Sequence, residues 1–299
     1  MSKRARGHFR RQLVLGAITA LGSTAGAARA DEPMFGYVNA TDLLPKGRWQ
    51  VEQWLTDRSG DASGRYDLLE GRIEADVGLA DNLQLTGYLN YARLDAQIGP
   101  HLPPGVRLSS SGGLSRRRLD GVTGEAIWRL ASPYLGPVGL ALLVDGTVGH
   151  GQRSVGLKAI IQKNFRDDTL VVAANARAEF GLKEKAPGAT LPLGLRSVTP
   201  IDLAAGVSYR FRPNWSAALE ARDRIKQAGP GFGSQLDSGL FLGPTVHYGG
   251  QRWFLTLSAM RRVAGRHRAP DRGLIADSLA FATDRLDWDG ARLRIGRTF

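Results

Sequence analysis

Apolar and polar residues alternate along residues 70–91, the stretch where the pattern of this chain is clearest. From 70 to 79 one parity is apolar or glycine and the other mostly charged, and from 83 to 91 one parity is mostly leucine and the other polar. Because successive strand residues point to opposite faces, the pattern predicts a two-stranded hairpin that turns at Ala80-Asp81. A soluble sheet would show the same alternation, so the hairpin alone does not identify its solvent.

The same alternation recurs along the chain and predicts twelve strands in all. Strands of about 10 to 13 residues exceed those typical of soluble sheets and match a tilted membrane crossing. Short connections after even-numbered strands and mostly longer ones after odd-numbered strands are typical of outer-membrane barrels, so the predicted fold class is all-β, a transmembrane antiparallel β-barrel of about 12 strands. Pro244 cannot donate to a ladder, so we expect a bulge there. The predicted strands cover residues 49–57, 70–79, 83–91, 119–130, 138–148, 155–165, 170–180, 201–211, 215–222, 240–248, 253–259 and 291–299.

Aromatic residues give a second signal, because many lie on the apolar parity at the short-turn ends of the predicted strands. Rings at this height form the interfacial girdle of a membrane barrel. The predicted girdle consists of Trp49, Trp128, Phe165, Phe211, Trp215, Tyr248, Trp253 and Phe299.

Lipid explains why the chain would close into a barrel, since an unpaired backbone N–H or C=O group costs several kcal/mol in hydrocarbon. The apolar parity then faces lipid and the charged parity faces the lumen. A water-filled pore and a salt-bridged plug are both compatible with such a lining. Nine acidic and eight basic side chains are nearly balanced, which argues against strong ion selectivity. The predicted lumen-facing charges are Glu52, Glu70, Arg72, Glu74, Asp76, Glu125, Arg129, Asp145, Lys158, Arg177, Glu179, Asp202, Arg210, Glu220, Arg222, Arg292 and Arg294.

The first 30 residues have the features of a secretory signal peptide. A basic head precedes an apolar stretch, and Ala28 and Ala30 supply the small residues that signal peptidase requires. Cleavage is therefore expected after Ala30, followed by a periplasmic lead-in at 31–46 and a barrel domain that completes residues 31–299. The predicted location is the outer membrane of a Gram-negative cell.

Composition narrows the choice of partners. The formal charge is +12, of which residues 1–30 carry +6, so the mature chain has +6 and its excess of Lys and Arg is modest. This does not favour nucleic acid as a partner, whereas attraction to anionic lipid headgroups is expected. Cysteine is absent, which excludes disulfides. After Ala30 the sequence has no apolar run long enough for a membrane helix.

Both ends of the predicted barrel resemble known outer-membrane proteins. The last strand ends at Phe299 and resembles the terminal signal by which such proteins are recognised by the assembly machinery, although Arg297 departs from the pattern. Residues 35–37, 41–47 and 52–54, which read FGY, TDLLPKG and EQW, are similar to the opening of an uncharacterised family of predicted outer-membrane β-barrel proteins. The resemblance implies the architecture and brings no assigned activity.

The favoured hypothesis for function is a passive, porin-like channel for small hydrophilic solutes. The alternative is a non-conducting structural or adhesion barrel that contacts lipopolysaccharide phosphates or an acidic partner through basic external loops at 95–118 and 261–284. The arginines of those loops are Arg116, Arg117, Arg118, Arg261, Arg262, Arg266 and Arg268.

A lipid-modifying enzyme is a third and more distant hypothesis. The twelve-stranded outer-membrane phospholipase resembles this chain in strand count only, since its catalytic His and Ser lie two apart and no His-x-Ser occurs here. His150 and Ser154 are the nearest approach, so no catalytic residue is predicted. No cofactor or metal is predicted either, because His101, His247 and His267 are isolated and Asp57, Asp61 and Asp67 fit no ion-binding loop.

Overall fold

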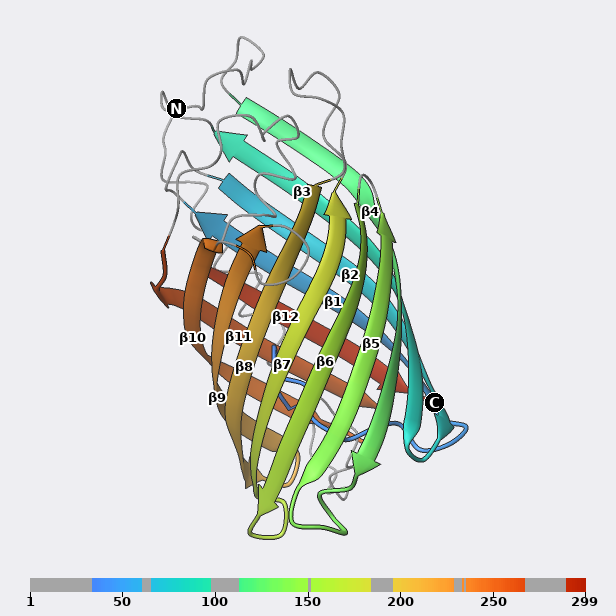
Figure 1. Cartoon of the computed structure of the whole chain (residues 1–299). Coiled ribbons are helices and arrows are strands. Elements are labelled where there is room, and N and C mark those ends of the chain that lie inside the picture. The colour runs from blue at the N-terminus through green and yellow to red at the C-terminus, as the bar shows by residue number, and fades with distance from the viewer. Residues whose placement is uncertain are drawn as a thin grey trace.

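The protein folds into a closed antiparallel β-barrel of twelve strands (Figure 1). The computed structural model describes residues 34–60, 66–97, 113–149, 152–183, 196–228, 233, 235–266 and 289–299. The predicted signal peptide therefore lies outside the described residues. The strands are β1 (Trp49–Gly60), β2 (Tyr66–Ala80), β3 (Leu83–Gln97), β4 (Gly113–Ala131), β5 (Gly139–Gly149), β6 (Gln152–Phe165), β7 (Leu170–Lys183), β8 (Arg196–Arg212), β9 (Trp215–Ala228), β10 (Gln235–Gly249), β11 (Trp253–Ala264) and β12 (Asp289–Thr298).

Each strand pairs with its neighbours in the chain, and β1 closes the barrel by pairing with β12 from Gln50↔Thr298 to Ser59↔Asp289. Closure satisfies the backbone groups of both edge strands, as lipid requires. The predicted fold class and strand number are thus confirmed. Within the described residues, no helix has the length and apolar character needed to cross a membrane.

The alternation of the sequence divides the side chains between the two faces of the wall. On β5, Leu140, Leu142 and Val144 are exposed on the outside, whereas the alternate residues Leu143 and Asp145 are buried inside. The outside of the barrel is therefore apolar and the inside mixed. This distribution of apolar and polar side chains is the opposite of that in a soluble protein. The strand register fixes it, because a shift of one residue would exchange the two faces.

Strands extend further from the short turns than the sequence predicted. The stretch 95–118, predicted as a loop, includes the last residues of β3 and the first six residues of β4, and β11 continues to Ala264 inside the predicted loop 261–284. Polar residues on both faces hid these extensions, because the ladder continues where the apolar face ends. The central part of each predicted loop lies outside the described residues.

The bulge predicted at Pro244 is wrong. Pro244 pairs in regular register with Leu219 of β9. The register shifts of β10 lie instead between Gln235 and Asp237, opposite β9, and between Leu240 and Phe241, opposite β11. The register with β11 passes over Gly243 and Pro244 without a shift. Loss of one N–H donor therefore interrupts the ladder locally without adding a residue to the strand.

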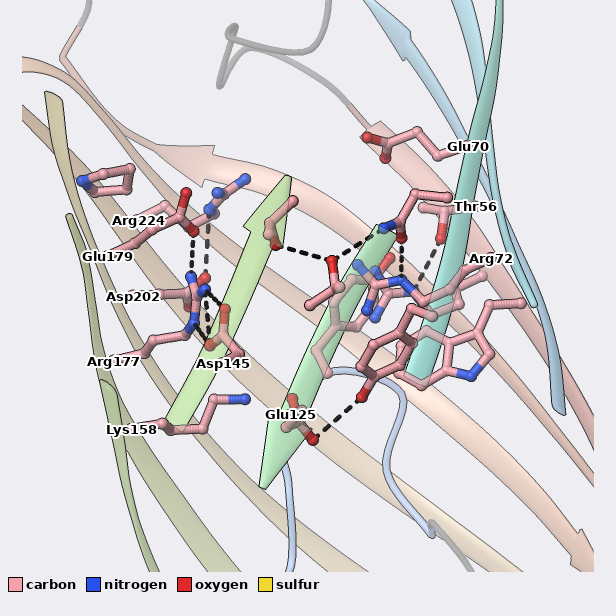
Figure 2. A pocket seen from close by; sticks show the side chains of 18 of the residues that line it. Thr56, Glu70, Arg72, Glu125, Asp145, Lys158, Arg177, Glu179, Asp202 and Arg224 are labelled. Atoms are coloured by element: carbon pink, nitrogen blue, oxygen red, sulfur yellow. Dashed lines mark hydrogen bonds and ion pairs between the residues drawn. The ribbon is translucent and has the colours of Figure 1, made fainter. Parts of the chain in front are cut away.

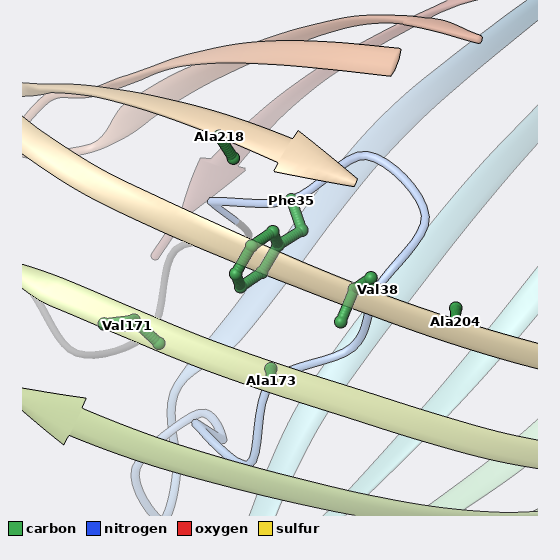
Figure 3. Close-up of a cluster of buried hydrophobic side chains, with 6 residues drawn as sticks. All are labelled: Phe35, Val38, Val171, Ala173, Ala204 and Ala218. Atoms are coloured by element: carbon green, nitrogen blue, oxygen red, sulfur yellow. The ribbon is translucent and has the colours of Figure 1, made fainter. Parts of the chain in front are cut away.

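Most of the predicted periplasmic lead-in, residues 31–46, lies inside the barrel. Residues 34–46, here called the inner segment, have no regular secondary structure and lie within the lumen (Figure 3). Phe35, Val38, Leu43 and Leu44 are all buried. Burying such side chains is favourable by about 1.5–3 kcal/mol each, which supports docking of the segment against the wall.

One polar residue on the lipid parity has an explanation. Gln53 shares its parity with apolar residues of β1, and its amide nitrogen donates to the Tyr91 hydroxyl at 2.9 Å and to the Arg72 carbonyl at 3.0 Å. The Tyr91 ring lies over Gly71, where any Cβ would be 1.9 Å from the ring. The amide is therefore paired even though it faces outwards.

Candidate functional site in the barrel interior

The inner segment is fixed by lumen-facing side chains from four strands. Gln84 of β3, Gln162 of β6 and Asn175 of β7 accept hydrogen bonds from the backbone N–H groups of Leu44, Thr41 and Asn39, at 2.9, 2.6 and 2.6 Å. Glu220 of β9 holds the beginning of the segment. The segment thus follows the inner wall from β9 past β7 and β6 to β3, in the half of the barrel nearest the short turns.

Glu220 is the strongest of these fixing points. Its carboxylate accepts hydrogen bonds from the backbone N–H groups of Gly36, Tyr37 and Val38 at 2.8, 2.8 and 2.9 Å, and one from the Thr245 hydroxyl. The side chain is fully buried. Burial of a carboxylate is tolerated because four donors replace its water.

Glycines on the lumen face make room for the inner segment. A Cβ at Gly206 would lie 2.7 Å from the Phe35 ring, and one at Gly139 would lie 2.4 Å from the Thr41 hydroxyl. At Gly78 the clash would be with the carbonyl of Pro45, at 2.3 Å. The wall therefore has a path of small residues into which the segment fits, consistent with a docked position specified by the sequence.

Two apolar clusters complete the packing of this half. Phe35 and Val38 pack with Val171, Ala173, Ala204 and Ala218 on three neighbouring strands (Figure 3). The second cluster groups Leu43 with Ile127, Ala141, Leu143 and Ile160. These lumen-facing apolar residues lie where the segment passes and leave the short-turn half of the lumen packed.

The other half of the lumen holds a cavity of about 390 Å³, here called the loop-side cavity. Its floor includes Gly36, Tyr37, Val38 and Asn39 of the inner segment. Most of its wall is charged (Figure 2). The charged residues that line it are Arg58, Glu70, Arg72, Arg118, Asp120, Glu125, Asp145, Lys158, Arg177, Glu179, Asp202, Arg222, Arg224, Lys226, Arg292 and Arg294.

One side of the cavity is a network of ion pairs. Arg177 bonds Asp145 at 2.9 Å and Glu179 at 2.6 Å, and Arg222 bonds Asp202 through two guanidinium nitrogens. Figure 2 shows the labelled members of this network side by side. Each acid here has an arginine partner, so the network fixes the β5, β7, β8 and β9 walls relative to one another.

The other side combines arginines with aromatic rings. The Arg292 guanidinium lies 3.9 Å from the ring centroid of Tyr37 and 5.0 Å from that of Trp54. Arg72 lies 4.6 Å from the Tyr88 ring and 5.3 Å from the same Trp54 ring. Stacking on aromatic faces favours guanidinium groups that have lost part of their water.

Below this side, three buried carboxylates lie together. Oxygens of Glu52, Glu74 and Asp76 are within 4.8 Å of one another. Arg294 bonds Glu52 at 2.7 Å, and Glu74 Oε2 and Asp76 Oδ2 have no hydrogen-bond partner among the residues that the structure describes. An all-oxygen set is the kind that hard divalent cations prefer, and Arg294 already supplies positive charge there.

The structure distributes the predicted lumen-facing charges over four places. Eleven line the loop-side cavity: Glu70, Arg72, Glu125, Asp145, Lys158, Arg177, Glu179, Asp202, Arg222, Arg292 and Arg294. Glu52, Glu74 and Asp76 form the buried acidic group, and Glu220 holds the inner segment. Arg129 lies beside the first short turn, where it donates to the Asp81 carbonyl at 2.6 Å, and Arg210 pairs with Ser216 at the β8–β9 turn.

Sequence reasoning missed five charged residues of the cavity: Arg58, Arg118, Asp120, Arg224 and Lys226. Arg58, Arg224 and Lys226 continue the charged parity of their strands beyond the predicted ends, so extending the alternation would have found them. With them, ten basic and six acidic side chains line the cavity, a net charge of +4 rather than near balance.

The proposed girdle residues lie at the short-turn end on the outer face. Trp49, Trp128, Phe165, Phe211, Trp253 and Phe299 are exposed, and Trp215 and Tyr248 pack against each other at 5.0 Å. Phe299 stacks on Trp49 at 3.9 Å across the closure. Arg297, the departure from the terminal pattern, lies 4.7 Å from the Phe299 ring and 5.2 Å from that of Trp253.

The remaining candidates for chemistry do not form a common site among the residues described. Ser154 lines the loop-side cavity, while His150, its only nominated partner, lies outside the described residues. His247 is buried and shares a hydrogen bond of 2.8 Å with Thr256. His101, His267, Asp61 and Arg268 lie outside the described residues.

One titratable group of the inner segment lies at the short-turn rim. The Asp42 carboxylate accepts hydrogen bonds from Gln162 Nε2 at 3.0 Å and from the Tyr134 hydroxyl at 2.8 Å. Burial raises the pKa of Asp42 and also that of Tyr134. Both shifts favour the neutral forms of the two groups.

Comparison with solved structures places this barrel among outer-membrane proteins. An outer membrane channel from Pseudomonas putida F1 aligns with a TM-score of 0.61 at 14% identity, covering 90% of this chain and 100% of that one. The NanC porin aligns with a TM-score of 0.51 at 11% identity, covering 83% of this chain and 98% of that one. Identities this low establish the fold alone.

Comparison of sequences gives the family and no activity. No curated protein matches the chain. A family model matches residues 27–281 and is described as a family of unknown function, DUF6662. This confirms the resemblance inferred from residues 35–54. The chain belongs to the DUF6662 family.

Proposed function

We propose that the protein is a passive channel of the Gram-negative outer membrane for small hydrophilic solutes. The loop-side cavity is the observation that carries this proposal. It is enclosed by ten of the twelve strands and lined by sixteen charged side chains, whose burial is sustainable only if they are paired or hydrated. A hydrated chamber of this kind is what a solute path requires.

The fold and the outer surface support the membrane location. The exposed face of the barrel is apolar along its strands, and similar barrels include an outer membrane channel. We further propose export by cleavage after Ala30, contact of the outer face with lipid and lipopolysaccharide, and recognition of the Phe299 end by the assembly machinery. The exposed aromatic residues at the short-turn end then form the periplasmic girdle.

The inner segment sets the narrowest part of the proposed path. It crosses the short-turn half of the lumen, where apolar clusters pack around it. A solute that enters the loop-side cavity must therefore pass beside this segment or displace it. Small conductance is expected, well below that of barrels with more strands.

Single-channel recording of the refolded mature protein in planar bilayers tests the proposal. Discrete conductance steps are expected, and their amplitude should fall when neutral polymers small enough to enter the pore replace part of the salt solution. Protein that migrates as a folded barrel yet gives no conductance above bare bilayer would contradict the channel function.

A non-conducting structural barrel is the second candidate, and the docked inner segment is the observation that favours it. In that case Glu220, the glycine path and the apolar clusters would serve to close the lumen permanently. The same recording separates the two candidates, because a permanently closed barrel gives no steps at any voltage.

A further inference from the structure

The loop-side cavity has an excess of positive charge of +4 when every side chain has its ordinary charge at pH 7. One reason for the excess is that four acidic residues of the lumen lie outside the cavity: Glu52, Glu74, Asp76 and Glu220. The other is that Arg224 and Lys226 continue the charged lumen-facing positions of β9 into the cavity. A hydrated cavity with walls of one predominant sign concentrates ions of the opposite sign.

The acidic side chains of the cavity already have partners. Glu70 bonds Arg58 at 2.7 Å, Asp120 bonds Arg118 at 2.6 Å, and the acids of the ion-pair network bond Arg177 and Arg222. Glu125 accepts a hydrogen bond from the Tyr88 hydroxyl at 3.1 Å. These carboxylates therefore offer little to a cationic solute.

Arg72 and Arg292 differ from the other arginines of the cavity, because neither contacts a carboxylate in the part of the chain that the structure describes. Arg72 donates through Nε to Asn90 Oδ1 at 3.0 Å. Arg292 donates to the Thr56 hydroxyl at 3.0 Å and to the Gly36 carbonyl at 2.8 Å. A guanidinium has five N–H donors, so both retain donors beyond these bonds.

Aromatic rings hold these two guanidinium groups in position. Trp54 lies between 5.0 and 5.3 Å from both, and Tyr37 and Tyr88 each stack on one of them. Stacking occupies the flat faces, whereas the N–H groups lie along the edges. A positioned guanidinium edge matches the two oxygens of a carboxylate or phosphate.

We propose that the channel conducts anions in preference to cations, and that Arg72 and Arg292 form a binding site for an oxyanion group, carboxylate or phosphate, on the transported solute. This inference rests on the proposed channel function and names its substrate class. Tyr37 places the inner segment in the same site, so the solute binds where the path begins to narrow.

Ion selectivity is measured from the reversal potential in a gradient of KCl across the bilayer. Wild-type protein is expected to pass chloride several-fold better than potassium. Addition of glucose 6-phosphate or glucuronate should block the current, and neutral glucose should not. The phosphate and carboxylate arms show which oxyanion binds more tightly.

The matched variants separate a specific site from net charge. The double variant R72Q/R292Q removes two charges from the aromatic side, and R58Q/R118Q removes two charges from arginines of the same cavity that bond Glu70 and Asp120. Both should lower anion preference. Only R72Q/R292Q should abolish block by the two sugar acids, and equal loss of block in both variants would overturn the site.

Failure of the inference is distinguishable from failure of the channel function. Steps that show no preference for chloride, or a preference for potassium, overturn the inference and leave the channel standing. If no steps are seen, the channel function fails, and calorimetric titration of the folded protein with glucose 6-phosphate and glucuronate then decides the site. Binding by the wild type that is lost in R72Q/R292Q supports the oxyanion site. Heats of titration with the two sugar acids that are no larger than the heat with glucose overturn the site.

Discussion

The two halves of the barrel interior are built on the same strands and the same parity, yet one is packed and the other is hollow. In the short-turn half, small and apolar lumen-facing residues pack against the inner segment, and the polar side chains of Glu220, Asn175 and Gln162 bond to it. In the loop-side half, lumen-facing residues are long and charged and enclose a cavity of about 390 Å³.

This difference shows that strand parity decides which side chains face inwards, whereas side-chain size decides whether the space is filled from within the wall. Where the wall offers glycine and alanine, a separate piece of chain supplies the missing volume, since protein interiors are close-packed. Where the wall offers arginine and glutamate, charge pairing and hydration occupy the lumen instead. The proposed solute path joins the two halves at Tyr37.

Deletion of residues 34–46 is expected to have the largest effect. The inner segment takes no part in the strand ladder, so the twelve-stranded barrel should still close. Conductance should rise several-fold because the short-turn half of the lumen is emptied, leaving its polar side chains to water. Single-channel recording of the refolded variant measures the change.

The control for this deletion is the folded state of the barrel. Migration on gels before and after heating should distinguish folded from unfolded protein for both forms. Unchanged conductance in a variant that is folded would show that the inner segment does not limit the path, and the contrast between the two halves would lose its functional meaning.

Substitution of Gly206 by valine should have an intermediate effect. A Cβ at this position lies 2.7 Å from the Phe35 ring, so the branched side chain must displace the inner segment or strain the wall. Overpacking of this kind costs about 1–3 kcal/mol in the free energy of unfolding. Denaturant unfolding in micelles measures that cost, and single-channel recording should show a smaller rise in conductance than the deletion gives.

Gly87→Val is the matched control for Gly206→Val. Gly87 also lies within a strand, but nothing is within 4 Å of a Cβ placed there on the outer face. It should leave conductance and stability near those of the wild type. If both variants behave alike, the effect at Gly206 comes from replacing a strand glycine by valine and not from the docking of Phe35.

The fold was predictable from sequence because lipid makes the alternation of residues strict. Ile73 and Leu257 are exposed on the outside and Arg72 lines the cavity, as parity predicts. The eleven predicted charges of the cavity were found in this way. Parity fails where the ladder is irregular: the register shifts between Asn90 and Tyr91, opposite Gly121, which adopts a φ of 137°.

That irregularity explains two of the missed residues. Beyond Gly121 the faces of β4 exchange, so Arg118 and Asp120 turn inwards while Leu119 is exposed. A bulge inserts a residue and reverses parity, and a lone glycine in a strand is only a weak indication of one. The other missed residues required only longer strands.

The docking of the inner segment was not predictable from periodicity, because the segment has no regular structure and its partners lie far away in sequence. Phe35 contacts residues of strands β7, β8 and β9. The available signal was indirect: lumen-facing positions such as Ala173, Ala204 and Gly206 are too small to fill a barrel of this size. Unfilled lumen positions together with apolar residues before the first strand would have indicated a segment inside.

The smallest expected effect concerns Asp42 and the pH dependence of docking. Burial raises the pKa of Asp42, so the protonated carboxyl is favoured in the docked segment relative to the free one. Stabilisation of the docked state is therefore full at pH below the ordinary carboxyl pKa and declines as pH rises through the raised value. The neighbouring charges of Asp168 and Arg129 act in opposite directions on the pKa of Asp42.

Conductance should rise modestly as pH increases from the ordinary carboxyl pKa through the raised pKa of Asp42. Asp42→Asn, which retains an acceptor for Tyr134, should flatten this rise. An identical pH profile in Asp42→Asn would show that another group controls it, and the short-turn half would then be insensitive to the charge of its own segment.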